Sequence, residues 1–108
     1  MRVELPDGQW VDLREELTHG QFKRLMRAQI RRETEPEAGP DVLTEFVAVY
    51  ASAWLLRAPD GSNIDLPADL DARLAIIDAM PATVVATVAD KAIDIWRGRP
   101  DPNASAAS

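Results

Sequence analysis

The side chains that could do chemistry in this chain are few and widely spaced. His19 is the single histidine, and no serine, aspartate or glutamate lies at a spacing from it that is typical of a catalytic triad. Metal sites and acid–base sites need several converging groups, so we interpret His19 as a partly exposed residue at a helix start. The chain has no cysteine, which excludes disulfide scaffolds, thiolate zinc sites and cysteine nucleophiles together.

An acidic run has the composition of a calcium loop but not its spacing. Counted from Asp60, the third position is Ser62, the fifth is Ile64 and the sixth is not glycine. We interpret the run as a loop followed by an acidic helix start, which the helix dipole favours. The five glycines are scattered rather than gathered in a phosphate loop, and neither Ser52 nor Ser62 has a visible base. We therefore expect no enzymatic activity, no metal and no cofactor.

Length and composition are those of one ordinary globular domain. The chain has 108 residues, of which 46% are hydrophobic and 28% are charged. The formal net charge of -6 argues against bulk attraction to nucleic acid or to an anionic membrane. The first residues lack the apolar core of a signal peptide, and the longest apolar stretch, 46–56, is about half of the ~20 residues that span a bilayer.

The charge is unevenly distributed along the chain. Residues 1–32 hold seven Lys/Arg and five Asp/Glu, whereas residues 33–108 hold five and thirteen. Helical periodicity places four cations on one face, opposite an apolar face of Phe22, Leu25, Met26 and Ile30. This basic face is either a solvated surface or a docking surface for an acidic protein, and the absence of helix-turn-helix spacing argues against DNA binding. Its members are Lys23, Arg24, Arg27 and Arg31.

The elements that would position these side chains are one hairpin and four helices. Residues 2–14 alternate apolar and polar residues around Pro6-Asp7-Gly8, which predicts a β-hairpin that must lie on helices. A capping box of Thr18 and Gln21 predicts a helix that runs to about residue 32. Further helices are predicted over about 42–57, about 67–79 and about 81–97.

The fold class predicted from this order is mainly α, a small four-helix domain with an N-terminal β-hairpin. The domain spans 1–97, and residues 98–108 are expected to form a disordered C-terminal tail. The helix at about 42–57 has the widest apolar arc and is expected to be central. Trp54 and Trp96 are expected in the core, whereas Trp10 in the hairpin is expected to be half exposed and to contact a partner.

Two motifs of low specificity support a resemblance that covers roughly residues 3–97. The first runs Val3-Glu4-Leu5-Pro6-Asp7-Gly8-Gln9-Trp10-Val11-Asp12-Leu13-Arg14, and the second is Asp78-Ala79-Met80-Pro81 before the last helix. With the intervening basic and apolar helices, this layout resembles the tail assembly chaperones of long-tailed actinobacterial phages. One departure is Leu55-Leu56-Arg57 after Trp54, where such proteins often have a short polar–aromatic segment.

The resemblance implies a non-enzymatic protein that binds the tape measure protein, keeps its hydrophobic helical segments soluble and recruits tail-tube subunits. It further implies a place in the bacterial host cytoplasm, no membrane, and absence from the mature virion. The partner-binding residues would be Lys23, Arg24, Arg27, Arg31 and Trp10. The alternatives are a ring-forming head–tail connector or other minor particle protein, and a small host-directed regulator that acts through the basic helix.

Overall fold

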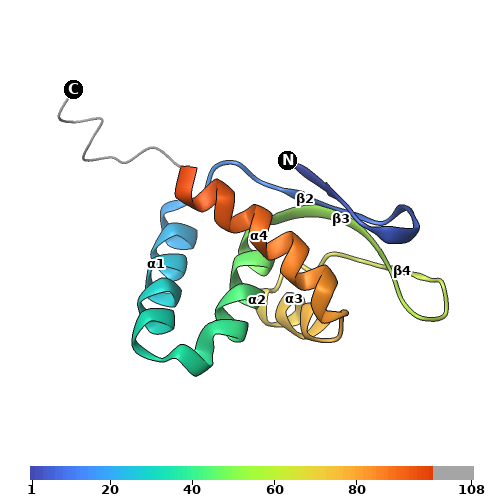
Figure 1. Ribbon diagram of the computed structural model, residues 1–108. Helices are drawn as coiled ribbons and strands as arrows, with labels where there is room; N and C mark the ends of the chain where they lie inside the picture. The colour runs from blue at the N-terminus through green and yellow to red at the C-terminus, as the bar shows by residue number, and fades with distance from the viewer. Residues whose placement is uncertain (99–108) are drawn as a thin grey trace.

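A computed structural model describes residues 1–98, which form an antiparallel sheet with helices packed on one of its faces (Figure 1). The sheet has four strands in the order β1-β2-β3-β4. Short 3-10 turns lie at Pro6–Gly8 and Pro36–Ala38. In chain order the elements are β1 (Arg2–Glu4), β2 (Trp10–Leu13), α1 (His19–Thr34), α2 (Gly39–Tyr50), β3 (Ala51–Arg57), β4 (Asn63–Ile64), α3 (Leu70–Asp78) and α4 (Ala82–Gly98).

The N-terminal hairpin is confirmed. β1 pairs antiparallel with β2, and the apolar positions of the alternating pattern are buried under the helices: Val3, Leu5, Val11 and Leu13. The turn between the strands needs positive φ at two successive residues, 63° at Asp7 and 74° at Gly8. Aspartate and glycine are among the residues that adopt this conformation most readily, which explains the turn chemistry read in the sequence.

The predicted helix at about 42–57 is wrong over its second half. α2 ends at Tyr50, and Ala51 turns at once into extended backbone with φ -64° and ψ 120°. The following residues form β3, in which Trp54 and Leu56 alternate with more exposed positions. β3 pairs with β2, with Val11 opposite Trp54, so it covers a hairpin edge that would otherwise leave its backbone groups unpaired.

The sheet has a fourth strand that the sequence pattern did not indicate. β4 is two residues long and pairs antiparallel with the end of β3. The indole Nε1 of Trp54 donates a hydrogen bond to the Ile64 carbonyl at 2.9 Å, which ties the two strands together through a core side chain. The described part of the chain is therefore mostly helical but mixed α/β, rather than a four-helix domain with a hairpin alone.

Three of the four predicted helices lie close to their expected ranges. The Thr18–Gln21 capping box is formed in both directions, at 3.2 Å and 2.9 Å. α3 begins at Leu70 behind the N-cap Asp69, three residues later than expected, and α4 reaches Gly98. Gly98 thus belongs to a helix rather than to the predicted tail, and residues 99–108 of that prediction lie outside the described residues.

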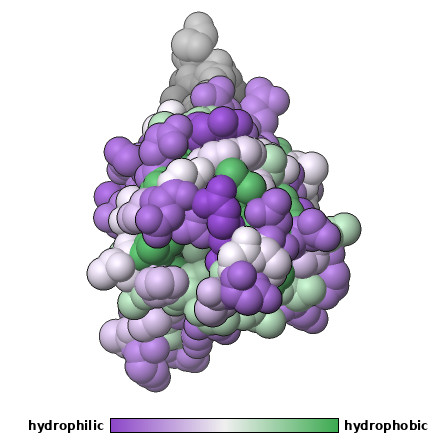
Figure 2. Space-filling model, turned by 90° about the vertical axis from the view of Figure 1, so that its right-hand side faces the viewer, coloured by the Kyte–Doolittle hydropathy of each residue, from purple (hydrophilic) through white to green (hydrophobic). Residues whose placement is uncertain are grey.

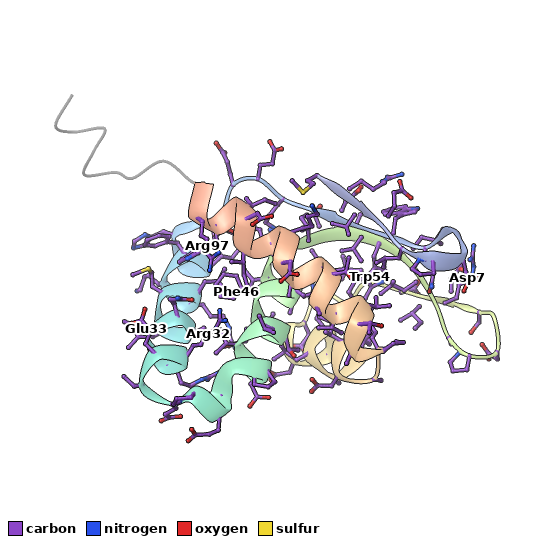
Figure 3. All side chains as sticks on the ribbon, in the orientation of Figure 1. Asp7, Arg32, Glu33, Phe46, Trp54 and Arg97 are labelled. Carbon is purple, nitrogen blue, oxygen red and sulfur yellow. The ribbon has the colours of Figure 1, made fainter. Side chains whose placement is uncertain are left out.

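α2 lies at the centre of the helical layer and contacts each of the other three helices. Its Phe46 ring packs edge-on against Trp96 of α4 at 5.5 Å between centroids, and Trp96 also meets Phe22 of α1 at 5.6 Å. Figure 3 shows Phe46 in the space between α1 and α4. Trp54 and Trp96 are buried, as predicted.

Candidate partner-binding surfaces

The four cations predicted to share one exposed face of α1 do not act alike. Arg31 donates from Nη2 to Glu45 Oε2 of α2 at 3.1 Å, and Arg24 Nε lies 3.3 Å from Glu45 Oε1. The Glu45 side chain is only 13% exposed. These two arginines therefore hold α1 against α2, which corrects the expectation that all four point away from the core.

α1 is rotated about its own axis relative to the predicted orientation. Its buried residues are Leu25 and Ala28, whereas Met26 and Ile30, expected in the core, are 37% and 54% exposed. On a helical wheel this is roughly a quarter turn, because successive residues are ~100° apart. Leu25 and the small Ala28 thus face the core, while Met26 and Ile30 stay outside.

The rotation places exposed cations and exposed apolar side chains side by side. Lys23 and Arg27 are exposed on the same side of α1 as Met26 and Ile30, one helical turn apart within each pair. We call these four residues the outer α1 strip. It combines positive charge with apolar contact area, which suits a protein partner with an acidic and apolar face.

Trp10 lies away from this strip. It is the first residue of β2, stands opposite Leu55 of β3 on the sheet face away from the helices, and is partly exposed. The Arg2 guanidinium lies 3.8 Å from the centre of its ring. Figure 3 places the hairpin turn at Asp7 and the α1 residues Arg32 and Glu33 at opposite ends of the molecule. The predicted partner-binding residues therefore do not form one surface.

An apolar groove at the hairpin end was missed by sequence reasoning. It has a volume of about 370 Å³ and lies where the β3–β4 hairpin meets the corner between α3 and α4. Figure 2 looks onto this end and shows hydrophobic areas framed by hydrophilic ones. We call it the end groove, and its lining residues are Gln9, Leu56, Arg57, Ala58, Pro59, Ile64, Ile76, Ala79, Met80, Pro81 and Val84.

The rim of the end groove is tied to the hairpin turn through Arg57. Its Nη1 donates to the Asp7 carbonyl at 2.6 Å, and its backbone amide donates to Gln9 Oε1 at 2.9 Å. The sequence signals were the Met80-Pro81 helix break and the turn at 58–61. They could not be brought together from the sequence, because the apolar pattern of the β3 residues predicts a helix there.

A second, polar hollow of about 410 Å³ lies beside the Glu45 ion pairs and is lined by residues from α1, α2 and α3. Acidic residues predominate there, including Glu35, Asp41 and Asp78. Within residues 1–98, no group of three His, Cys, Asp or Glu side chains is placed to hold a metal ion. His19 is exposed at the first position of α1.

Among the same residues, no helix is both long enough and apolar enough to cross a bilayer. Comparison with models of protein families, with curated proteins and with solved structures found no match to this chain. The surfaces described above are therefore interpreted from their own geometry and chemistry.

Proposed function

We propose that this chain is a non-enzymatic phage tail assembly chaperone that binds a hydrophobic helical segment of the tape measure protein in the end groove. The groove is the observation that carries the proposal. Its walls include Leu56, Ile64, Ile76, Met80 and Val84, all apolar and at the surface end of the core. An amphipathic helix binds such a groove by laying its apolar face into it, and no catalytic group is needed.

The chemistry of the rim refines the expected client. Arg57 is the charged residue that lines the end groove, and its guanidinium is already held by the hairpin turn. A client helix with an acidic residue beside its apolar face would find a positioned cation there, and little side-chain entropy would be lost on binding. The resemblance of the whole-chain layout to tail assembly chaperones supports the same client.

The outer α1 strip supplies a second surface for the recruitment of tail-tube subunits. α1 lies at one end of the molecule, and the β3–β4 hairpin that borders the end groove extends toward the other (Figure 1). A chaperone that brings a tape measure protein and tube subunits together needs two surfaces that do not overlap. We propose that the end groove holds the client and that Lys23 and Arg27 steer the second protein. Such a protein would act in the host cytoplasm and leave before the virion matures.

Co-expression with the tape measure protein tests the proposal. Ala79→Lys places an ammonium group in the end groove, and because Ala79 is the exposed C-cap of α3, a cation there is compatible with the helix dipole. The matched control is Ala75→Lys, an exposed position of the same helix that does not line the groove. We expect the wild type and Ala75→Lys to keep the tape measure protein in the soluble fraction, and Ala79→Lys to lose most of this effect.

Two results would contradict the proposal. If Ala79→Lys keeps the tape measure protein as soluble as Ala75→Lys does, the end groove is not the client site. If purified virions contain this chain in stoichiometric amounts, the head–tail connector becomes the better hypothesis, because a connector stays in the particle and a chaperone leaves it.

A further inference from the structure

Three arginines from separate segments line one hollow beside the start of α1. Arg14 lies between β2 and α1, Arg24 lies in α1 and Arg73 lies in α3. The hollow has a volume of about 550 Å³, and none of its lining residues is acidic. We call it the arginine pocket, and its other lining residues are Thr18, Gly20, Gln21, Ala48, Val49, Ala68 and Leu70.

Part of this arrangement has a structural role at the junction of α2 and β3. Arg73 Nη1 donates to the carbonyls of Ala48 and Ala51, both at 3.0 Å, and Arg14 Nη2 donates to the Ala51 carbonyl at 3.1 Å. Two guanidinium groups thus share one acceptor and stand side by side. Burial and the neighbouring charge of Arg14 lower the pKa of Arg73. The carbonyls explain the position of the arginines but do not neutralise them.

Two guanidinium nitrogens at the pocket lack a hydrogen bond. Within residues 1–98, the buried Nε atoms of Arg14 and Arg24 have no hydrogen-bond partner, and Arg24 Nε has only the ion pair with Glu45 Oε1 at 3.3 Å. Glu45 offsets part of the positive charge, but it is shared with Arg31. Gly20 lies in the first helical turn, where backbone amides have no partner within the helix.

We propose that the arginine pocket binds a phosphate group carried by a larger molecule. Guanidinium groups match phosphate oxygens with paired N–H donors, and buried donors are costly unless a ligand satisfies them. Three arginines against one shared carboxylate suit a doubly charged group better than a single carboxylate. Because the cavity is much larger than one phosphate and has a partly apolar wall, the phosphate is part of a larger ligand. This inference does not depend on the proposed chaperone function.

Substitution at Gly20 gives a test that spares the arginines that support the fold. A Cβ atom at Gly20 would have Thr18 Oγ1 as its nearest neighbour at 4.0 Å, so a side chain fits. Gly20→Glu puts a carboxylate into the pocket at a helix start, where negative charge is tolerated. Gly20→Gln has the same size without the charge and serves as the matched control.

The measurement is calorimetric titration of the full chain with phenyl phosphate, inorganic phosphate and benzoate at constant ionic strength. We expect phenyl phosphate to bind the wild type more tightly than either of the other two probes. Gly20→Gln should bind it within a few-fold of the wild type, and Gly20→Glu should weaken it at least ~tenfold through charge repulsion. The Nε–H resonances of Arg14 and Arg24 should shift as phenyl phosphate is added.

Three outcomes would overturn the proposal. Benzoate binding as tightly as phenyl phosphate would show that the pocket recognises a carboxylate. Equal affinity in the wild type and Gly20→Glu would place the phosphate elsewhere on the surface. No saturable binding, in a wild-type protein that is folded by circular dichroism, would show that the three arginines only support the α2–β3 junction.

Discussion

α1 and α2 are neighbouring helices that contact each other, but they differ in how much of their surface is buried. α2 buries seven of its twelve residues, whereas α1 buries two of its sixteen. α2 is enclosed by the sheet and the other helices, and α1 is held by Leu25, Ala28, the Phe22–Trp96 contact and the ion pairs to Glu45. The stability of the fold therefore resides mainly in α2, while α1 keeps most of its surface available to partners.

The cations follow the same division. Arg73 and Arg14 donate to carbonyls at the end of α2, where the helix dipole is negative and no loop separates the helix from β3. Arg24 and Arg31 face the single carboxylate of Glu45. Lys23 and Arg27 lie on the outer side of α1. The cations therefore form three groups: two support the end of α2, two pair with Glu45 between the helices, and two are exposed on α1. Substitutions can test each group separately.

The largest effect is expected at the centre of α2. Phe46 has no exposed surface and packs against Tyr50 and Trp96, so Phe46→Ala leaves a cavity among aromatic rings. We expect a loss of about 3–5 kcal/mol in the free energy of unfolding, measured by urea denaturation. The control is Ile30→Ala on the outer side of α1, which should cost less than ~1 kcal/mol. Similar losses in the two variants would contradict the division between α1 and α2.

The next effect is expected at the end of α2. Arg73→Gln removes a guanidinium that donates to three carbonyls, those of Ala48, Ala51 and Pro67. Arg14 still donates to the Ala51 carbonyl, but the Ala48 and Pro67 carbonyls lose the Arg73 donors at a partly buried junction. We therefore expect the free energy of unfolding to fall by about 1–3 kcal/mol. Arg97→Gln, at an exposed position of α4, provides the control and should leave the unfolding midpoint almost unchanged. A midpoint equal to that of the control would show that the junction is stable without this cap.

Elements that are bounded by local chemistry could be predicted from the sequence. The hairpin was recognisable because Asp7 and Gly8 suit a turn of positive φ between alternating strands. The start of α1 was recognisable because Thr18 and Gln21 satisfy each other's backbone amides. In both cases a few adjacent residues determine the local conformation, and the rest of the fold only has to accommodate it.

Features decided by distant contacts could not be predicted in the same way. In the segment 42–56, apolar residues lie on so many sides that the sequence does not show where the helical period ends and the strand period begins. The strand after Tyr50 is defined by its pairing with β2. The rotation of α1 depends on Glu45, which attracts Arg24 and Arg31 toward α2. The end groove and the arginine pocket were missed for the same reason, because each joins residues that are far apart in sequence.

A smaller effect is expected where α1 meets α2. Glu45→Gln removes the carboxylate that pairs with Arg24 and Arg31, while the side chain keeps its size. Because the arginines are partly exposed, we expect a loss of only about 1 kcal/mol in the free energy of unfolding, and the loss should shrink in 1 M salt. Glu37→Gln, an exposed acid in the 3-10 turn Pro36–Ala38, is the control. A loss independent of salt would show that Glu45 acts by packing rather than by charge.

The smallest effect on stability, and the clearest effect on association, is expected on the outer α1 strip. The double variant Lys23→Glu/Arg27→Glu should unfold within ~1 kcal/mol of the wild type, because exposed charges contribute little to stability. If the strip steers an acidic partner, the association rate with tail-tube subunits should fall, as measured by stopped-flow fluorescence. The difference should fade at high salt, because screening shortens the reach of charges to ~3 Å at 1 M.

The same helix contains the control for this last experiment. Arg24→Glu/Arg31→Glu makes an identical change of charge in the same helix, but it turns the attraction to Glu45 into repulsion. That variant should be less stable than Lys23→Glu/Arg27→Glu, and its loss of stability should depend on salt. Equal stability of the two variants would mean that α1 does not rest on Glu45. An unchanged association rate in the Lys23→Glu/Arg27→Glu variant would mean that the outer α1 strip is only a solvated surface, because a net change of four charges on a steering face must slow an acidic partner.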